Sequence, residues 1–92
     1  MIEIKFEALK NKSAAYDAQT EIGYCSFIAD GDIWTVNHTV VDEKYGGQGI
    51  AKRLLTCVVE NAKSQGKKIK PVCSYVVREF EKHPELYKEV AI

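Results

Sequence analysis

The sequence predicts a mixed α/β (α+β) fold. We expect a mostly antiparallel, mixed sheet of about five strands, a main helix after the fourth strand, and helices at the C-terminus. Two observations support this fold class. The first half alternates apolar with polar residues at the period of two that half-buried strands show. From Gln48 onward, apolar residues recur at i, i+4 and i+8, the period of a helix with one buried stripe. Because the chain has 92 residues, we expect a single domain over 1–92.

Four strands account for the first half of the chain. A turn at Lys10-Asn11-Lys12 separates the first strand from the second. The third and fourth strands flank Asp30-Gly31, a dipeptide typical of a tight hairpin. The four predicted strands follow one another as a meander and cover residues 2–9, 13–19, 21–29 and 32–41.

The second half contains the helices. The main helix ends at Gly66, because glycine readily adopts the left-handed conformation that terminates helices. Residues 69–73 are predicted to form a fifth strand and residues 74–83 a second helix. Pro84 begins a last turn that contains Tyr87, since proline at a first helical position loses no hydrogen bond. The buried stripe of the main helix comprises Ile50, Ala51, Leu54, Leu55, Val58, Val59 and Ala62.

Charge and cysteine content narrow the class of protein. Thirteen basic and thirteen acidic side chains cancel, so the chain lacks the positive field of a nucleic-acid-binding protein, and we expect no nucleic-acid partner. Three cysteines without paired spacing predict neither a disulfide framework nor a zinc site. Reduced thiols indicate the cytoplasm. Residues 1–10 lack a continuous apolar run, so we expect no signal peptide and no membrane span. We expect a monomer.

Three glycines lie at the start of the main helix, in the sequence KYGGQGIAKRLL. A helix N-terminus presents unpaired N–H groups, and residues without side chains allow a phosphate to reach them. The spacing does not fit a Walker A loop, which needs GxxxxGK[ST]. It also fits a dinucleotide fingerprint poorly, because Lys52 occupies the third glycine position and a hairpin precedes the loop. The glycines therefore indicate a phosphate or pyrophosphate cradle, with a plain glycine-rich turn as the alternative.

The loop resembles the acyl-CoA loop [QR]xxGx[GA] of the GNAT superfamily of N-acetyltransferases. Gly46-Gly47-Gln48-Gly49-Ile50-Ala51 fits that pattern at Gly49 and Ala51 and departs from it at Gly46, where the family has arginine or glutamine. More closely, the chain resembles the short, single-domain GNAT-like proteins of the YjdJ type. That resemblance runs through NHTVVDEKYGGQGIAKRLL, KPVCSYV and EKHPELY, three motifs in order along most of the chain.

The resemblance implies acetyl-CoA as the cofactor. It implies that backbone groups near Thr39 and Val41 hold the pantetheine arm between a fourth and a fifth strand that splay apart. Pro71 agrees with such a break, because proline donates no hydrogen bond to a sheet. An ordinary edge proline is the alternative. The loop amides implied to hold the pyrophosphate are those of Gly46, Gly47, Gln48, Gly49, Ile50 and Ala51.

His38 is the first of three candidate catalytic residues. Alternation along the fourth strand places it on one face with Trp34, Val36 and Val40. On the residue pattern alone, His38 is a core imidazole with satisfied nitrogens. The resemblance favours a catalytic base that faces the cofactor cleft.

Cys73 and Tyr87 are the other two candidates. Cys73 is predicted to end the fifth strand directly before Ser74, a good N-cap, and a thiol beside a helix N-terminus has its thiolate stabilised. The resemblance brings the CoA thioester to the same place, whereas Cys25 and Cys57 are expected to be ordinary buried cysteines. Tyr87 lies in LYKEV, which resembles the GNAT segment whose tyrosine protonates the departing thiolate; packing against the sheet is the alternative.

These observations predict an acyl-CoA-dependent acyltransferase with an unknown amine or thiol acceptor. His38 would act as its base, and transfer would be direct or through Cys73. A non-catalytic acyl-CoA-binding or sensing module is the second hypothesis, and an interaction domain without cofactor is the third. The acceptor is not predicted, because the turn at Asn11 leaves no room for the helices with which GNAT enzymes shape their acceptor site.

Overall fold

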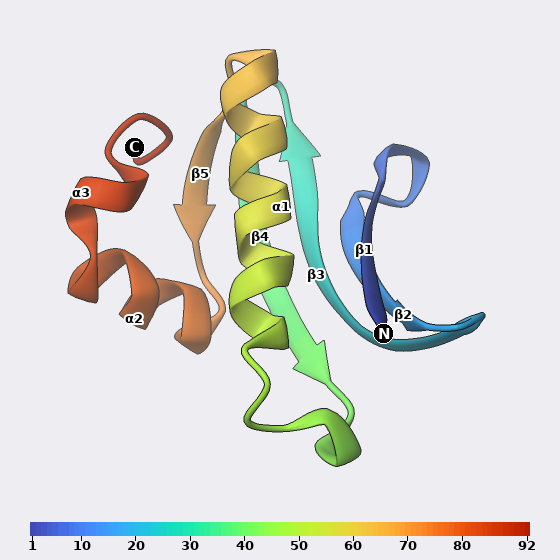
Figure 1. Cartoon of the computed structure of the whole chain (residues 1–92). Helices are drawn as coiled ribbons and strands as arrows, with labels where there is room; N and C mark the ends of the chain where they lie inside the picture. Colours follow the sequence, from blue (N-terminus) through green and yellow to red (C-terminus); the bar gives the residue numbers. More distant parts are fainter.

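A computed structural model describes all residues, 1–92, and contains one five-stranded sheet with the strand order β1-β2-β3-β4-β5 (Figure 1). The first four strands pair antiparallel as a meander, and β5 pairs parallel to β4. This arrangement confirms the predicted fold class. The strands are β1 (Ile2–Glu7), β2 (Lys12–Asp17), β3 (Thr20–Asp30), β4 (Ile33–Val41) and β5 (Lys68–Pro71).

The helices also follow the predicted order. The main helix ends at Gly66, whose left-handed backbone and N–H bonds to the Ala62 and Lys63 carbonyls close its last turn. The first strand was predicted to reach residue 9, but it ends at Glu7, because the next three residues form a short 3₁₀ helix. The helices are η1 (Ala8–Lys10), η2 (Glu43–Tyr45), α1 (Ile50–Gln65), α2 (Ser74–Lys82) and α3 (Pro84–Tyr87).

The hydrophobic core lies between α1 and one face of the sheet. Figure 1 shows α1 lying in front of β4, between β5 and β3, with α2 and α3 beside β5 at one edge. Phe27 stacks on Trp34 with ring centroids 4.2 Å apart. None of the helices has the length and the apolar character that a membrane span requires. The buried stripe of α1 consists of Ile50, Leu54, Leu55, Val58, Val59 and Ala62, as predicted except for Ala51, which is half-buried.

A β-bulge in β4 changes which side chains face the core. Ser26 pairs with His38 and Phe27 pairs with Val36, so Asn37 is an extra residue without a partner on β3. One extra residue reverses the alternation beyond it. Trp34 and Val36 are therefore buried under α1, whereas His38 and Val40 are exposed on the opposite face. The prediction that His38 shares a face with Trp34 and Val36 was wrong for this reason.

The strands β4 and β5 separate halfway along β4. Their pairing covers Ile33–Val36 and Lys68–Pro71 only. The Val36 carbonyl accepts hydrogen bonds from the N–H groups of both Val72 and Cys73, at 3.0 and 3.1 Å, and this turn carries the chain away from β4. The fifth strand consequently ends at Pro71, two residues before the predicted end. Beyond Val36, β4 has no strand beside it at that edge, which confirms the predicted splay.

Candidate active site

The unpaired edge of β4 forms the first part of the site. The Asp42 N–H donates to the Ile22 carbonyl of β3 at 2.8 Å. Because successive residues of a strand direct their backbone groups to opposite edges, His38 and Val40 also bond toward β3. The backbone groups of Thr39 and Val41 then point to the edge that β5 has left. Neither residue makes a backbone hydrogen bond at that edge, so an extended ligand can be bonded along β4, with the Thr39 N–H also close to the Cys73 thiol.

The glycine loop joins the end of β4 to the start of α1. Gly47 and Gly49 have φ values of +76° and +73°, a region that only glycine adopts readily, and Gly49 is the N-cap of α1. A Cβ placed on either glycine would have no protein atom within 4 Å. Gly46 is extended, with φ −63°, and its N–H donates to the Glu43 carbonyl at 3.1 Å, so this amide, which was predicted to hold the pyrophosphate, is already bonded within the protein. Two of the three glycines are thus required by the backbone turn itself, and the space in front of them is open.

Consecutive N–H groups of this loop have no acceptor within the protein. The first hydrogen bond of α1 runs from the Arg53 N–H to the Gly49 carbonyl, so the N–H groups from Gly47 through Lys52 donate to no backbone or side-chain atom. Donors in such a row, at the positive end of a helix dipole, suit a phosphate or pyrophosphate. The first turn of α1 also contains no acidic residue that would compete for them. The loop therefore fits the pyrophosphate that the sequence resemblance implies.

Polar contacts at its other end hold this loop in place. The Asp42 carboxylate accepts a hydrogen bond from the Lys44 N–H at 2.9 Å and caps η2. The Tyr45 hydroxyl donates to the Asp17 carboxylate of β2. The loop is therefore tied to the sheet on one side and continues into α1 on the other.

Cys73 lies across the gap from the free edge of β4. Its Sγ is 3.6 Å from the Thr39 Oγ1. The structure makes Cys73 itself the N-cap of α2, so the prediction of Ser74 as N-cap was wrong by one position. Burial raises the pKa of the Cys73 thiol. The Thr39 hydroxyl and the backbone N–H groups of Val76, Tyr75 and Thr39 outweigh burial, so the pKa lies below its ordinary value. The Cys73 side chain forms no regular capping hydrogen bond with α2.

The other two thiols have the opposite environment. Cys25 is fully buried, and burial raises its pKa to about 11. Burial also raises the pKa of Cys57. Among the cysteines, Cys73 alone combines a lowered pKa with partial exposure.

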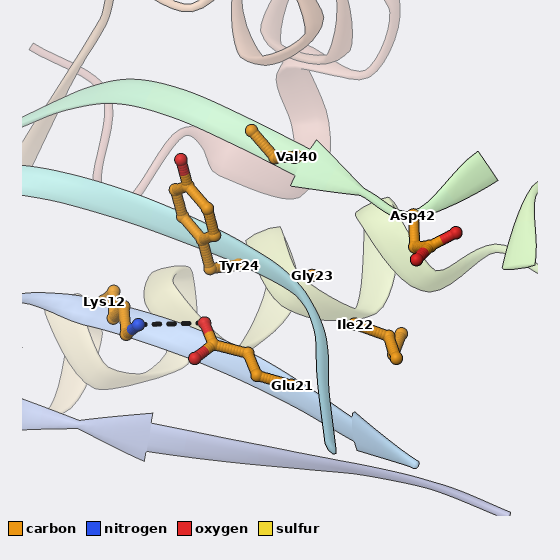
Figure 2. Close-up of a pocket in the computed structure, with 7 residues that line it drawn as sticks. All are labelled: Lys12, Glu21, Ile22, Gly23, Tyr24, Val40 and Asp42. Carbon is orange, nitrogen blue, oxygen red and sulfur yellow. Dashed lines mark hydrogen bonds and ion pairs between the residues drawn. The ribbon is translucent and has the colours of Figure 1, made fainter.

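His38 does not contact Cys73. Its side chain is exposed on the sheet face that no helix covers, opposite Ser26. Beside it on that face, β2, β3 and β4 line an open groove of about 540 Å³ (Figure 2). The ammonium of Lys12 bonds the Glu21 carboxylate at 2.8 Å within this groove. The residues that line the groove are Lys12, Glu21, Ile22, Gly23, Tyr24, Val40 and Asp42.

Tyr87, the last residue of α3, is buried against α2. Its ring stacks on Phe80 with centroids 4.5 Å apart, and its hydroxyl donates to the Glu79 carboxylate at 2.9 Å. Lys52, from the first turn of α1, approaches the same carboxylate at 3.3 Å. Burial and the Glu79 carboxylate raise the pKa of Tyr87. The hydroxyl is thus engaged by Glu79 and not by Cys73.

Two features of the site were missed in the sequence. The Thr39 side chain was not singled out, because without the bulge at Asn37 it would face away from Cys73. The contact of Lys52 with Glu79 was missed because it joins helices that are distant in the chain, although both residue types are ordinary ion-pair partners. No sequence motif marks either feature.

The chain matches the family model of GCN5-related N-acetyl-transferases over residues 7–90. It belongs to this family. No protein of curated function matches the chain significantly. The chain resembles a GCN5-like protein from Staphylococcus aureus, solved in solution by NMR, with 32% identity over 98% of this chain and 87% of the other, and a TM-score of 0.75.

More distant GNAT structures share the fold. The ribosomal-protein-S18-alanine N-acetyltransferase of Escherichia coli has 14% identity and a TM-score of 0.66, over 77% of this chain and 49% of the other. A GNAT acetyltransferase from Elizabethkingia anophelis, solved with acetyl-CoA bound, has 19% identity and a TM-score of 0.59, over 77% and 63%. This GNAT chain spans about half the length of the E. coli enzyme.

Proposed function

We propose that this GNAT domain is an acetyl-CoA-dependent acyltransferase that acts on an amine or thiol. The observation that supports it most strongly is the row of free N–H groups from Gly47 to Lys52, which begins where the unpaired edge of β4 ends. A charged pyrophosphate and an extended amide-containing arm need these two features side by side. The acetyl-CoA bound to the Elizabethkingia structure supports the choice of ligand.

In this proposal the loop and β4 hold the acyl donor. The N–H groups from Gly47 to Lys52 bind the pyrophosphate, and the backbone of Thr39 and Val41 bonds the amides of the pantetheine arm. An arm laid along β4 toward Val36 reaches the gap in which Cys73 lies. Acetyl-CoA supplies an acyl group already activated as a thioester.

Cys73 is the proposed nucleophile of a covalent route. Its thiolate forms a new bond to the acetyl carbonyl carbon while the bond from that carbon to the CoA sulfur breaks, and CoA takes up the proton that Cys73 has lost. The acceptor then attacks the acetyl group on Cys73, loses its own proton, and leaves Cys73 as the thiol. In direct transfer the acceptor attacks the thioester and Cys73 only contacts the acetyl group.

His38 is the proposed base for the acceptor. It lies on the uncovered face of β4 beside the gap, so an acceptor approaching from that face would meet it. The role of Tyr87 as a proton donor stays a prediction, since its hydroxyl would first have to leave Glu79.

A non-catalytic acetyl-CoA-binding module is the second candidate. The observation that favours it is the exposure of His38. No helix covers its face of the sheet, and the adjoining groove is open to solvent. Such a module would bind acetyl-CoA without turnover. For both candidates we propose a monomer in the cytoplasm, and the three unpaired cysteines support that compartment.

Calorimetric titration with acetyl-CoA, followed by measurement of CoA release in the presence of an amine and thiol panel, tests the proposal. We expect binding, and CoA release that depends on an acceptor. Binding without release would favour the module. No binding at millimolar acetyl-CoA would exclude both candidates.

A further inference from the structure

The Thr39 hydroxyl lies between two thiols of opposite character. Its Oγ1 is 3.6 Å from Cys73 Sγ on one side and 3.6 Å from Cys25 Sγ on the other. Cys25 is fully buried in β3, whereas Cys73 lies in the open gap. The bulge at Asn37 is what turns Thr39 toward both sulfurs, because it reverses the alternation of β4.

A hydroxyl has one hydrogen, so it can donate to only one of the two sulfurs at a time. When Cys73 is a thiol, it donates to Thr39 and Thr39 donates to Cys25, which are the directions that the structure contains. When Cys73 loses its proton, its sulfur becomes the stronger acceptor. Rotation of one bond then turns the Thr39 hydrogen to the thiolate. Cys25 stays protonated at neutral pH, since burial raises its pKa to about 11.

No charged side chain is placed to stabilise a Cys73 thiolate instead of the Thr39 hydroxyl. The titratable groups near the two thiols are Cys57 from α1 and Tyr75 from α2, and burial raises the pKa of both, so they are neutral near pH 7. Glu79, further along α2, is held by Lys52 and Tyr87. His38 lies on the other face of β4. Hydrogen bonds from neutral groups are therefore what a Cys73 thiolate has within reach.

We propose that Thr39 is a positioning residue of the acyl site, whose side-chain hydroxyl rotates from Cys25 to Cys73 and stabilises the Cys73 thiolate. This inference deepens the proposed function and rests on it for the role of Cys73 in acyl transfer. It is independent of acetyl-CoA in one respect, because ionisation of Cys73 can be measured on the protein alone. A failure of Thr39 to act and a failure of acyl transfer are therefore distinguishable.

Alkylation of the full chain by iodoacetamide at a series of pH values, with each cysteine followed by peptide mass spectrometry, tests this proposal. In Thr39→Val, a methyl group replaces the hydroxyl at nearly constant volume. We expect the midpoint of the Cys73 pH–rate curve to rise by about one unit, so that alkylation at pH 7 slows about tenfold. Thr39→Ser keeps the hydroxyl and should retain the wild-type midpoint.

Cys25 provides the control for folding in the same samples. It is fully buried, so it should stay unreactive in each folded variant. If Thr39→Val exposes Cys25, Thr39→Ala replaces it in the comparison with Thr39→Ser. An unchanged Cys73 midpoint in a folded variant without the hydroxyl would overturn the proposal, as would a Thr39→Ser midpoint that moves with that of Thr39→Val.

Discussion

The hydroxyl oxygen of Thr39 lies 3.6 Å from the sulfur of Cys73, across the gap where β4 and β5 no longer pair. The sequence marked Cys73 as a candidate nucleophile but did not indicate its contact with the Thr39 side chain. The bulge at Asn37 supplies the hydroxyl, and the early end of β5 at Pro71 brings the thiol to the N-cap of α2. The site thus arises from two interruptions of regular pairing in one sheet.

Substitution of Gly49 should abolish acetyl-CoA binding. Gly49→Val introduces a branched side chain into the open space before the free N–H groups and also strains a backbone with φ +73°. The strain costs about 1 to 2 kcal/mol in stability. The measurements are calorimetric titration with acetyl-CoA and thermal unfolding.

Gly31→Val is the matched control for this substitution. Gly31 has φ +59° and open space around it, but it lies in the hairpin between β3 and β4, away from the loop. It should lose comparable stability and keep the wild-type affinity. Equal losses of binding in both variants would show that strain, and not access to the N–H groups, explains the effect of Gly49→Val.

Truncation of Leu54 should strongly destabilise the domain. Leu54 is fully buried in the stripe of α1 that faces the sheet. Leu54→Ala should lower the free energy of unfolding by about 2 to 5 kcal/mol, because a cavity remains. The exposed neighbour Thr56 is the control, and Thr56→Ala should change it by less than about 0.5 kcal/mol. Similar urea midpoints for the two variants would contradict the packing described for α1.

Glu79 should make stability depend on pH below neutrality. Burial raises its pKa, but hydrogen bonds from Tyr87 and Lys52 and the charge of Lys52 outweigh burial, so the folded-state pKa lies below the ordinary 4.5. A carboxyl group with a lowered folded-state pKa stabilises the fold above its unfolded pKa, and this contribution is lost as the pH falls through the folded value. Glu79→Gln should therefore cost about 1 to 2 kcal/mol at pH 7 and less at pH 3.

Glu60 offers the control for Glu79. It forms a single ion pair with Lys63 at 3.8 Å, and its side chain is 64% exposed. Glu60→Gln should leave the free energy of unfolding nearly unchanged at both pH values. Urea unfolding of both variants at pH 7 and pH 3 gives the comparison. A loss for Glu79→Gln that is as large at pH 3 as at pH 7 would contradict the ionic role of Glu79.

The strands, the main helix and the glycine loop could be predicted from the sequence because their signals are local. The Asp30-Gly31 turn, the stripe that contains Leu54, and Gly66 each act within a few residues. The bulge at Asn37 could not be predicted in this way, since it is defined by the pairing of Ser26 with His38 and of Phe27 with Val36 across two strands. That one residue decides which side chains of β4 face the core.

The candidate site shows the same division between local and distant signals. Gly49 could be recognised from the sequence, because glycines directly before a helical pattern form a local signal for a phosphate site. The neighbourhood of Cys73 depends on where β5 leaves β4, which the hydrogen bonds to the Val36 carbonyl determine. Consequently the thiol was identified as a candidate, but its contact with the Thr39 side chain was not.

Acetylation of the protein by its own substrate tests the central claim most directly. Wild-type protein is incubated with acetyl-CoA and analysed by intact mass and by peptide mapping, with hydroxylamine treatment to identify a thioester. Since Cys73 has the lowered pKa and the open setting, we predict one hydroxylamine-labile acetyl group, located at Cys73, and none at Cys25 or Cys57. Cys73→Ala should bind acetyl-CoA and remain unlabelled. A wild-type protein that binds acetyl-CoA, acquires no acetyl group and releases no CoA to any amine or thiol acceptor would contradict the acyltransferase account.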